Sequence, residues 1–237
     1  MNDTMTEVNM MPPQTEGTRP RKVILPYDKT EEYYVEPLGE IHKKPFYDFI
    51  KRFFDIVLSF LSLLVLAIPM AVITAIIKCT SSGPVIYKQE RLGKDGVPYM
   101  MCKFRTMRPD AEENGAQWSN GDEDPRIVPQ LRWVRKIRAD ELPQFWLCLT
   151  GKMSLVGPRP ERACFYEEFE TYVHGFHERL KVKPGLTGLA QVNGGYDLKP
   201  EEKILWDVDY IKRRSLWLDA KIICNTVKIV LTGRGAK

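Results

Sequence analysis

The sequence contains only three histidines and five cysteines, and both shortages limit its chemistry. The cysteines are odd in number, lie far apart and form no Cys-x-x-Cys pair, so neither a disulfide framework nor a thiolate zinc site is indicated. We expect reduced thiols that fill the core, at Cys79, Cys102, Cys148, Cys164 and Cys224. His42, His174 and His177 lack acidic or cysteine partners at ligand spacing, which favours packing or surface roles over metal binding.

A cleavable secretory signal is also missing, because no apolar segment lies close to Met1. Residues 1–45 are instead polar, contain several prolines and show no helical or strand periodicity. This composition predicts a flexible N-terminal arm over residues 1–45.

The composition of the whole chain is that of a globular domain. Charged residues make up 28% of the 237 residues and apolar residues 43%, which excludes a disordered chain and a transporter with many spans. The formal net charge is +4, and many of the lysines and arginines lie close in sequence to one long apolar segment. Such a distribution suits anionic lipids or phosphates, and we expect no nucleic-acid partner.

The apolar segment covers residues 56–77, where 22 consecutive positions carry no charge. As a helix it would extend roughly 30 Å, enough for a membrane, and few core helices run that far without a charge. Lys51 and Arg52 precede it and Lys78 follows it, so the preference for cytoplasmic positive charge is satisfied at both ends.

Pro69 lies near the middle of this segment and predicts a kink there. A helix that enters the membrane, bends at Pro69 and leaves on the same face would explain both the proline and the flanking charges. Ser59 and Ser62 could then supply partners for backbone groups at the bend. The residues alone leave a second arrangement open, namely a single span with an incidental proline.

The remaining sequence predicts a mixture of helices and short strands. Residues 84–88 and 98–104 have strand character around the turn Gly93-Lys94-Asp95-Gly96. Residues 108–126 are acidic and rich in turn residues, which predicts a loop that is mobile or covers a site. Further helices are expected over residues 161–181 and 200–231, with a structured loop between them over residues 183–195.

Two adjacent carboxylates, Asp140 and Glu141, are the strongest candidates for chemistry. The apolar spacing on either side predicts two helices that meet here, and Pro143 is favourable in the first turn of a helix. A helix N-terminus stabilises an ionised carboxylate or a bound phosphate. Arginine forks suit phosphate oxygens, and four cations precede the two acids: Arg132, Arg135, Lys136 and Arg138.

Arg159 is the third candidate, because Pro158 and Pro160 hold its backbone extended and so direct its side chain. Two carboxylates close to several arginines are also typical of a buried ion-pair network. The residues by themselves leave both interpretations open.

Eight blocks of sequence, taken together, decide between them. They are residues 51–55 (KRFFD), 83–93 (GPVIYKQERLG), 103–107 (KFRTM), 124–127 (DPRI), 140–144 (DELPQ), 153–160 (MSLVGPRP), 183–194 (KPGLTGLAQVNG) and 215–219 (SLWLD). In order and spacing, residues 49–237 resemble the bacterial sugar transferases, the monotopic polyprenyl-phosphate phosphoglycosyl transferases.

The resemblance implies an α+β fold, mostly helical, with three parts: the arm of residues 1–45, a kinked re-entrant membrane helix over 46–80 that breaks at Pro69, and a cytosolic catalytic domain over 81–237. It implies transfer of a hexose-1-phosphate from a UDP-sugar to undecaprenyl phosphate, with release of UMP. The protein would then lie on the cytoplasmic face of the bacterial inner membrane and begin the assembly of an exopolysaccharide, a capsule or a glycoconjugate.

The same resemblance implies roles for individual residues. Asp140 would attack the β-phosphate and form a covalent phosphosugar intermediate, while Glu141, together with Asp140, would hold a Mg²⁺ ion. Lys103, Arg135 and Arg159 would bind the substrate phosphates. A second set is expected near the site on weaker grounds: Arg105, Gln191 and Asp207.

Other functions remain as alternatives. A non-catalytic, membrane-tethered scaffold of the polysaccharide machinery would use the same fold without turnover, and an ordinary glycosyltransferase would release UDP in place of UMP. UDP-glucose or UDP-galactose is the expected donor, with an N-acetylated sugar as the second choice. The sequence leaves open the pathway, a homo-oligomeric state and the function of the arm.

Overall fold

The computed structural model describes residues 32–113, 124–194 and 198–232. In this part of the chain the structure is α+β and mostly helical, as the sequence predicts. The elements, with 3₁₀ helices labelled η, are β1 (Tyr33–Tyr34), α1 (Pro45–Val65), α2 (Ala67–Thr80), β2 (Ile86–Leu92), η1 (Lys94–Gly96), β3 (Pro98–Phe104), η3 (Pro129–Leu131), α3 (Arg132–Lys136), η4 (Ala139–Gln144), α4 (Phe145–Thr150), β4 (Ser154–Val156), α5 (Ala163–Glu170), β5 (Val173–His174), η5 (Phe176–Lys181), β6 (Gly185–Thr187), α6 (Leu189–Gly194), α7 (Pro200–Arg213) and α8 (Leu216–Thr232).

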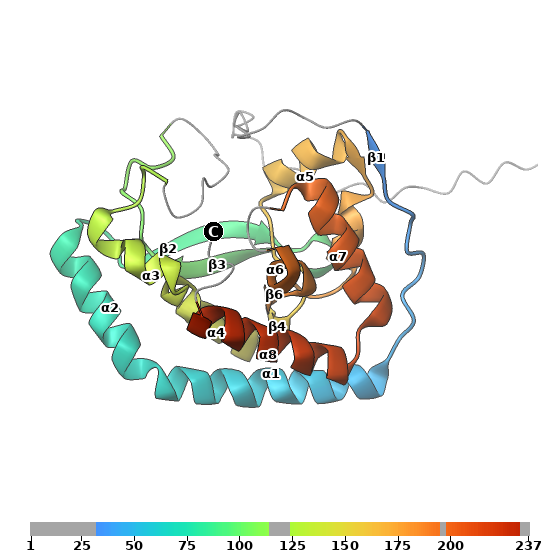
Figure 1. Ribbon diagram of the computed structural model, residues 1–237, viewed down its shortest axis with the longest axis horizontal. Helices are drawn as coiled ribbons and strands as arrows, with labels where there is room; N and C mark the ends of the chain where they lie inside the picture. The colour runs from blue at the N-terminus through green and yellow to red at the C-terminus, as the bar shows by residue number, and fades with distance from the viewer. Residues whose placement is uncertain (1–31, 114–123, 195–197, 233–237) are drawn as a thin grey trace, which may run out of the picture.

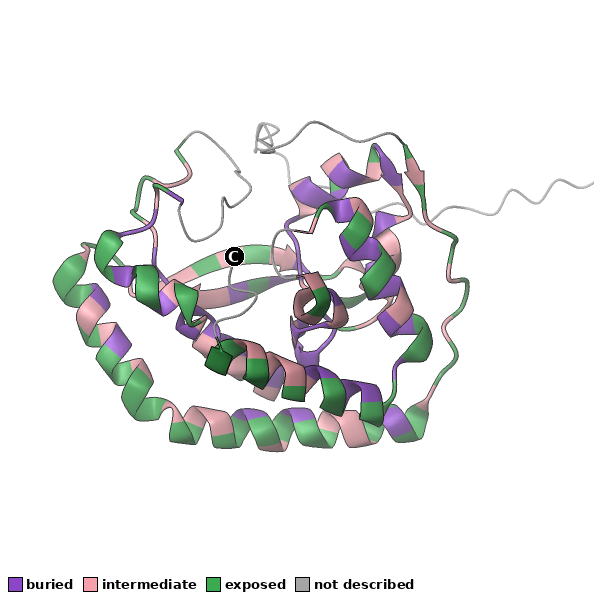
Figure 2. Ribbon diagram, in the orientation of Figure 1, coloured by how far each residue is buried: buried purple, intermediate pink, exposed green. Residues whose placement is uncertain are grey.

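Helices α1 and α2 form a bent pair along one edge of the molecule, and the other elements lie on its concave side (Figure 1). No single helix within the described ranges is long and apolar enough to cross a membrane, whereas α1 and α2 together are, across a bend of 59°. The outer face of the pair is exposed over much of its length (Figure 2). Its exposed apolar side chains include Phe46, Phe49, Phe53, Phe60, Leu64, Val65, Ile68 and Val72.

The bend lies at Leu66, three residues before the position that the sequence predicts. Pro69 occupies the first turn of α2, where its ring excludes the carbonyl of Val65, the last residue of α1. The proline therefore breaks the turn that precedes it. The Leu66 N–H donates to the carbonyl of Ser62 at 2.9 Å, and the side chain of Ser59 is buried away from the bend.

Strands β2 and β3 form the predicted antiparallel hairpin, with Ile86 opposite Phe104 and Leu92 opposite Pro98. The first strand is longer than predicted and reaches Leu92. The turn uses left-handed backbone conformations at Asp95 (φ 57°) and Gly96 (φ 75°), which aspartate and glycine tolerate. The centre of the loop predicted over residues 108–126 lies outside the described residues.

The prediction of a loop over residues 183–195 is wrong for most of its length. It contains strand β6, which pairs in parallel with β4, and helix α6. Here the glycines allow backbones to approach closely: a Cβ on Gly185 would lie 2.1 Å from the nitrogen of Gly157. Glycine and proline therefore indicate close packing in this segment, and its last residue lies outside the described part.

The predicted helices near the C-terminal end are interrupted. Residues 161–181 contain α5, the short strand β5 and η5, and residues 200–231 are divided into α7 and α8. The prediction that the cysteines fill the core is also only partly right, since Cys148 is buried while Cys79 and Cys224 are exposed.

The described end of the N-terminal arm is bound to the rest of the molecule. Strand β1 pairs in parallel with β5, and the Leu38 N–H donates to Glu178 at 2.8 Å. The Lys44 ammonium donates to the carbonyl of Arg214 at 2.9 Å, just before α1 begins. Residues 32–44 thus follow the surface of the domain, and residues 1–31 lie outside the described part.

Candidate active site

Asp140 and Glu141 lie in the first turn of the 3₁₀ helix η4, between α3 and α4. Both residues are buried. Arg138, immediately before η4, has a left-handed backbone conformation (φ 58°), an uncommon one for a residue with a Cβ. It turns the chain from α3 into η4 and so separates the two helices that the sequence predicts.

Arg159 forms a bidentate ion pair with Glu141. Its two terminal nitrogens lie 2.6 Å from Oε1 and 3.2 Å from Oε2 of the carboxylate. The sequence predicts a fixed direction for this side chain, and the structure directs it to the carboxylates. The pair joins residues 18 positions apart and brings the 153–160 block to the 140–144 block.

Asp140 differs from Glu141, because no hydrogen bond or ion pair joins its carboxylate to any other described residue. Burial and, to a smaller extent, the charge of Glu141 raise the pKa of Asp140 to about 6, against the opposing effect of Lys103, Arg135 and Arg159. A carboxylate of this kind is ionised at neutral pH and is available to a ligand.

Lys103 extends from strand β3, which packs against η4. Burial lowers the pKa of Lys103 to about 8, against the opposing effect of Asp140 and Glu141. Arg135 lies on α3 and also contributes positive charge at Asp140. Together with Arg159, which follows β4, three cations from separate parts of the chain act on Asp140.

A second layer of charges holds the segment that carries Arg159. Arg179 donates to the carbonyl oxygen of Arg159 at 2.8 Å and forms an ion pair with Asp207 at 2.7 Å. Next along the chain, Glu161 accepts from Lys203 and from Arg91, each at 3.1 Å. Asp207 is thus connected to the site through Arg179, although it touches neither Asp140 nor Glu141.

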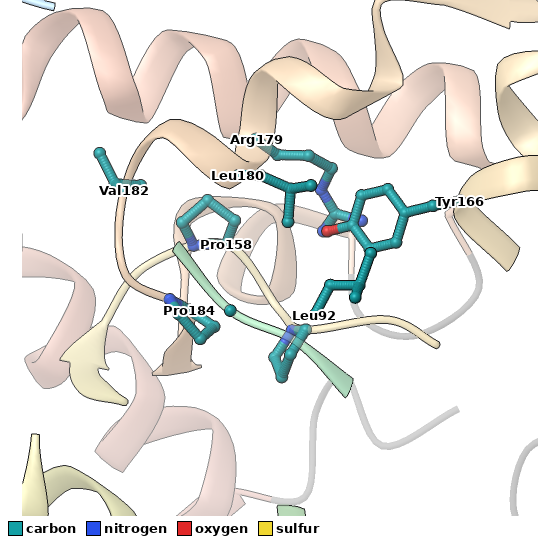
Figure 3. Close-up of a pocket in the computed structure, with 9 residues that line it drawn as sticks. Leu92, Pro158, Tyr166, Arg179, Leu180, Val182 and Pro184 are labelled. Carbon is teal, nitrogen blue, oxygen red and sulfur yellow. The ribbon is translucent and has the colours of Figure 1, made fainter. Parts of the chain in front are cut away.

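A shallow hollow lies behind this segment (Figure 3). Pro158 and Pro160 form part of its lining, and the Arg179 guanidinium lies beside the ring of Tyr166. Arg179 also lies 4.6 Å from the centre of the Phe176 ring. Aromatic packing and charge pairing together fix Arg179, which in turn donates to the carbonyl of Arg159.

Two of the residues predicted with weaker support are used elsewhere. Arg105 donates to the carbonyls of Ser81 and Ser82, at the end of α2, and so attaches that end to β3. Gln191 donates to the carbonyl of Leu186 at 3.3 Å, which links α6 to β6. Neither makes a hydrogen bond to the two carboxylates in the described part of the structure.

Sequence reasoning missed Arg179, Glu161 and Lys203. Arg179 lies on η5, Lys203 lies on α7 and Glu161 lies between β4 and α5, and no spacing in the sequence connects them. One available signal is that Glu161 follows Pro160 directly and therefore shares the rigid turn that directs Arg159.

The residues present fit a magnesium site that is completed by substrate. Across the described ranges, no group of three or more histidine, cysteine, aspartate or glutamate side chains has a metal-binding arrangement. Mg²⁺ usually takes one or two carboxylates and completes its shell with water and phosphates. The carboxylate of Asp140 is open to such an ion, while that of Glu141 is shared with Arg159. The histidines take other roles: the His177 ring pairs with Glu170 at 2.6 Å, and His174 stacks on Tyr34.

Comparison with known proteins gives several similar relatives, among them three transferases. The chain is 39% identical to the UDP-N-acetylgalactosamine-undecaprenyl-phosphate N-acetylgalactosaminephosphotransferase of Aeromonas hydrophila, over 88% of this chain and 50% of that protein. It is 38% identical to the UDP-glucose:undecaprenyl-phosphate glucose-1-phosphate transferase of Escherichia coli K12, over 82% and 42%. It is 37% identical to the undecaprenyl-phosphate galactose phosphotransferase of Salmonella typhimurium, over 79% and 42%.

The chain thus spans about half the length of the curated relatives it matches. A family model described as bacterial sugar transferase matches residues 46–233, from the first turn of α1 to the end of α8. The matched region contains the bent helix pair, both carboxylates and all the cations around them. The chain therefore belongs to the bacterial sugar transferase family.

Proposed function

We propose that the protein transfers a hexose-1-phosphate from a UDP-sugar to undecaprenyl phosphate and releases UMP. The observation that carries this proposal is the difference between the two buried carboxylates: Arg159 holds Glu141, whereas Asp140 is unpaired and faces three cations. One carboxylate is available for attack, and the cations can bind the phosphates. The relatives support the proposal, because each is named for this class of transfer.

In the first step, an oxygen of Asp140 attacks the β-phosphorus of the UDP-sugar. The bond from this phosphorus to the bridging oxygen breaks, and UMP leaves with that oxygen. The product is an acyl phosphate, in which the carboxylate of Asp140 is joined through oxygen to the phosphorus of the sugar phosphate. Lys103, Arg135 and Arg159 balance the negative charge on the phosphates, and such fixed charges are the main source of catalysis in phosphoryl transfer.

In the second step, a phosphate oxygen of undecaprenyl phosphate attacks the same phosphorus. The bond between Asp140 and phosphorus breaks, which restores the carboxylate and yields a sugar-diphospholipid. Asp140 and Glu141 would hold Mg²⁺, which supplies additional charge neutralisation at the phosphates when it is bound. Glu141 would share its carboxylate between the ion and Arg159.

The bent helix pair suggests where the reaction occurs. We propose that residues 46–80 insert into the cytoplasmic face of the bacterial inner membrane as a re-entrant element, and that residues 81–237 form the catalytic domain on that face. The exposed apolar side chains of the pair support insertion, since a surface of this size is unfavourable in water. A membrane setting brings the lipid phosphate to a carboxylate that a soluble nucleotide sugar can also reach.

The donor is proposed to be UDP-glucose or UDP-galactose, with an N-acetylated sugar as the alternative. The three relatives include all three kinds of donor in their names, so the comparisons do not choose among them. Measuring UMP release with each UDP-sugar in turn identifies the donor.

The decisive experiment measures which nucleotide the purified protein releases. With a UDP-sugar, Mg²⁺ and undecaprenyl phosphate in detergent, we expect UMP, and we expect Asp140→Asn to lower its rate by at least about 10³-fold. Release of UDP would indicate an ordinary glycosyltransferase, and no release would indicate a scaffold. Unchanged turnover in Asp140→Asn would exclude Asp140 as the nucleophile.

A further inference from the structure

One face of α1 carries polar residues that pack against the rest of the molecule. Tyr47, Lys51, Asp55 and Ser59 recur every four residues, with Arg52 next to them, so they form a single stripe along a mostly apolar helix. Asp55 and Ser59 are buried. The hydrogen bonds of this stripe show which elements of the domain it packs against.

Arg52 binds the end of the helix that continues from the carboxylates. Its two terminal nitrogens donate to the carbonyls of Cys148 at 2.6 Å and Leu149 at 2.7 Å, in the last turn of α4. The Cys148 carbonyl also accepts from the Gly151 N–H at 3.1 Å, and the guanidinium completes the cap on this last turn. Helix α4 begins at Phe145, directly after η4, so Arg52 is connected to Asp140 and Glu141 by continuous helix.

Asp55 binds the strand that leads to Arg159. One oxygen of its carboxylate accepts from the Ser154 hydroxyl at 3.1 Å and from the Leu155 N–H at 2.9 Å, both on β4. Strand β4 ends at Val156, and only Gly157 and Pro158 separate it from Arg159. The two elements that supply the active site are thus attached to neighbouring turns of α1.

A third contact attaches the same stripe to α8. The carboxylate of Asp219 accepts from Lys51 at 2.8 Å, from the Tyr47 hydroxyl at 3.0 Å and from the Tyr210 hydroxyl at 2.9 Å. The charged groups of Lys51 and Arg52 are therefore bound by oxygen atoms of the protein itself. From the sequence alone, the same two residues are interpreted as charges that flank a membrane segment.

We propose that Arg52 and Asp55 are positioning residues that hold the membrane helix in register with the active site. This inference rests on the function proposed above. The depth of α1 in the bilayer then sets the height of Asp140 and Arg159 relative to the lipid phosphate. A shift of about 1 Å in such an alignment is enough to slow a reaction on the order of 10²-fold.

The two half-reactions depend on this register to different degrees. The nucleotide sugar arrives from solution and reaches Asp140 at any helix depth, whereas undecaprenyl phosphate is held at the membrane surface. Loss of the register is therefore expected to impair the second step and to leave the first step nearly intact. A purely structural role for Arg52 and Asp55 would impair both steps equally.

The test compares Arg52→Ala and Asp55→Ala with the wild-type protein in lipid nanodiscs. We expect single-turnover UMP release from the UDP-sugar to stay within about threefold of the wild type. We expect kcat/KM for undecaprenyl phosphate in the same nanodiscs to fall at least about tenfold. In detergent micelles, where the acceptor is not held at a fixed depth, the second loss is expected to become smaller.

Asp48→Ala is the matched control, because Asp48 is an exposed acid in the first turn of the same helix. Asp55→Asn keeps an oxygen that can accept from the Leu155 N–H and is expected to retain most of the lipid-dependent rate. Ser154→Ala removes one hydrogen bond of the same contact from the strand side, and we expect a smaller loss in the same step. Ser154→Ala therefore allows the test at this contact if Asp55→Ala does not fold.

Equal losses in both steps, or no loss with the lipid acceptor, would overturn the positioning role. A wild-type protein that releases no UMP from any UDP-sugar would instead contradict the function proposed above. In that case a nitroxide label on α1 still measures the depth of the helix. A second label on η1 gives the depth of the catalytic domain. If the depth of α1 relative to this label is unchanged in Arg52→Ala and Asp55→Ala, the proposed positioning role is also contradicted.

Discussion

Burial brings the pKa values of Lys103 and Asp140 close to neutrality, to about 8 and about 6. In the mechanism proposed above, Asp140 attacks only when it is ionised, and Lys103 attracts phosphate only when it is protonated. Both conditions hold between these values, so activity is expected to be highest between pH 6 and 8 and to fall about tenfold one unit beyond either limit. A rate profile for UMP release from pH 5 to pH 9 measures both limits.

Lys103→Arg separates the two limits. A guanidinium stays charged throughout this range, so the alkaline fall is expected to disappear while the acid fall stays near pH 6. The control is Lys88→Arg, which changes an exposed lysine on the neighbouring strand β2. An alkaline limit that persists in Lys103→Arg would assign the titration to a different group.

The ion pair between Arg179 and Asp207 gives a prediction about stability. Both side chains are almost completely buried, so Asp207→Asn leaves an uncompensated guanidinium in the core. Breaking a buried pair in this way costs about 3–5 kcal/mol. Asp209→Asn is the matched control on the same helix: its pair with Arg213 lies at the surface, where such pairs contribute about 1 kcal/mol or less. Denaturant unfolding compares the two, and equal losses would contradict the prediction.

Some residues of the candidate site are visible in the sequence and others are not. Asp140, Glu141 and Arg159 lie in short blocks in which proline fixes the backbone, so local sequence indicates both their chemistry and their direction. Arg179 and Lys203 belong to elements that meet only in the fold, and no local pattern marks them. Arg105 shows the opposite case: it lies in a matching block, yet its guanidinium attaches the end of α2.

Among the elements, the pairing of β4 with β6 depends on glycine. A Cβ on Gly185 would lie 2.1 Å from the nitrogen and 2.5 Å from the oxygen of Gly157, directly after β4, and these backbone atoms cannot move away without separating the strands. Gly185→Ala is therefore expected to destabilise the protein by at least about 1–3 kcal/mol. It is also expected to lower activity, because β4 leads directly to Arg159.

Thermal unfolding and UMP release check this prediction, with Gly96→Asn as the control. Gly96 lies in the hairpin turn, where no heavy atom is within 4 Å of an added Cβ, and asparagine tolerates its positive φ. A Gly185→Ala protein as stable and as active as the control would show that the strands can separate without cost.

The same elements show why part of the fold was predictable. The β2–β3 hairpin has a local turn signal, Gly93 to Gly96, and the sequence predicts it correctly. The pairing of β4 with β6 is parallel and joins residues about 30 positions apart, so its glycines resemble those of a loop until the partner is known. Pro69 indicates the bend, but its ring breaks the turn that precedes it, so the bend lies at Leu66 and not at the proline itself.

At the scale of the whole molecule, both ends of the bent pair are attached to the same domain. Lys44, just before α1, donates to the carbonyl of Arg214, and Arg105 holds the carbonyls of Ser81 and Ser82 after α2. Between these ends, Ile73 and Ile77 of α2 pack in a core cluster with Phe104. A helix that crosses the bilayer would place its ends on opposite faces, and this domain could not hold both.

We therefore expect single cysteines at positions 43 and 82 to react with a membrane-impermeant maleimide from the same side. The native cysteines are replaced first, since Cys79 and Cys224 are exposed. A third cysteine in place of Lys94, an exposed residue of η1, reports the side on which the catalytic domain lies. Inverted vesicles are expected to label all three positions, and right-side-out vesicles none. Labelling of positions 43 and 82 from opposite sides would contradict the re-entrant arrangement, because the contacts of Lys44 and Arg105 could not then exist in one molecule.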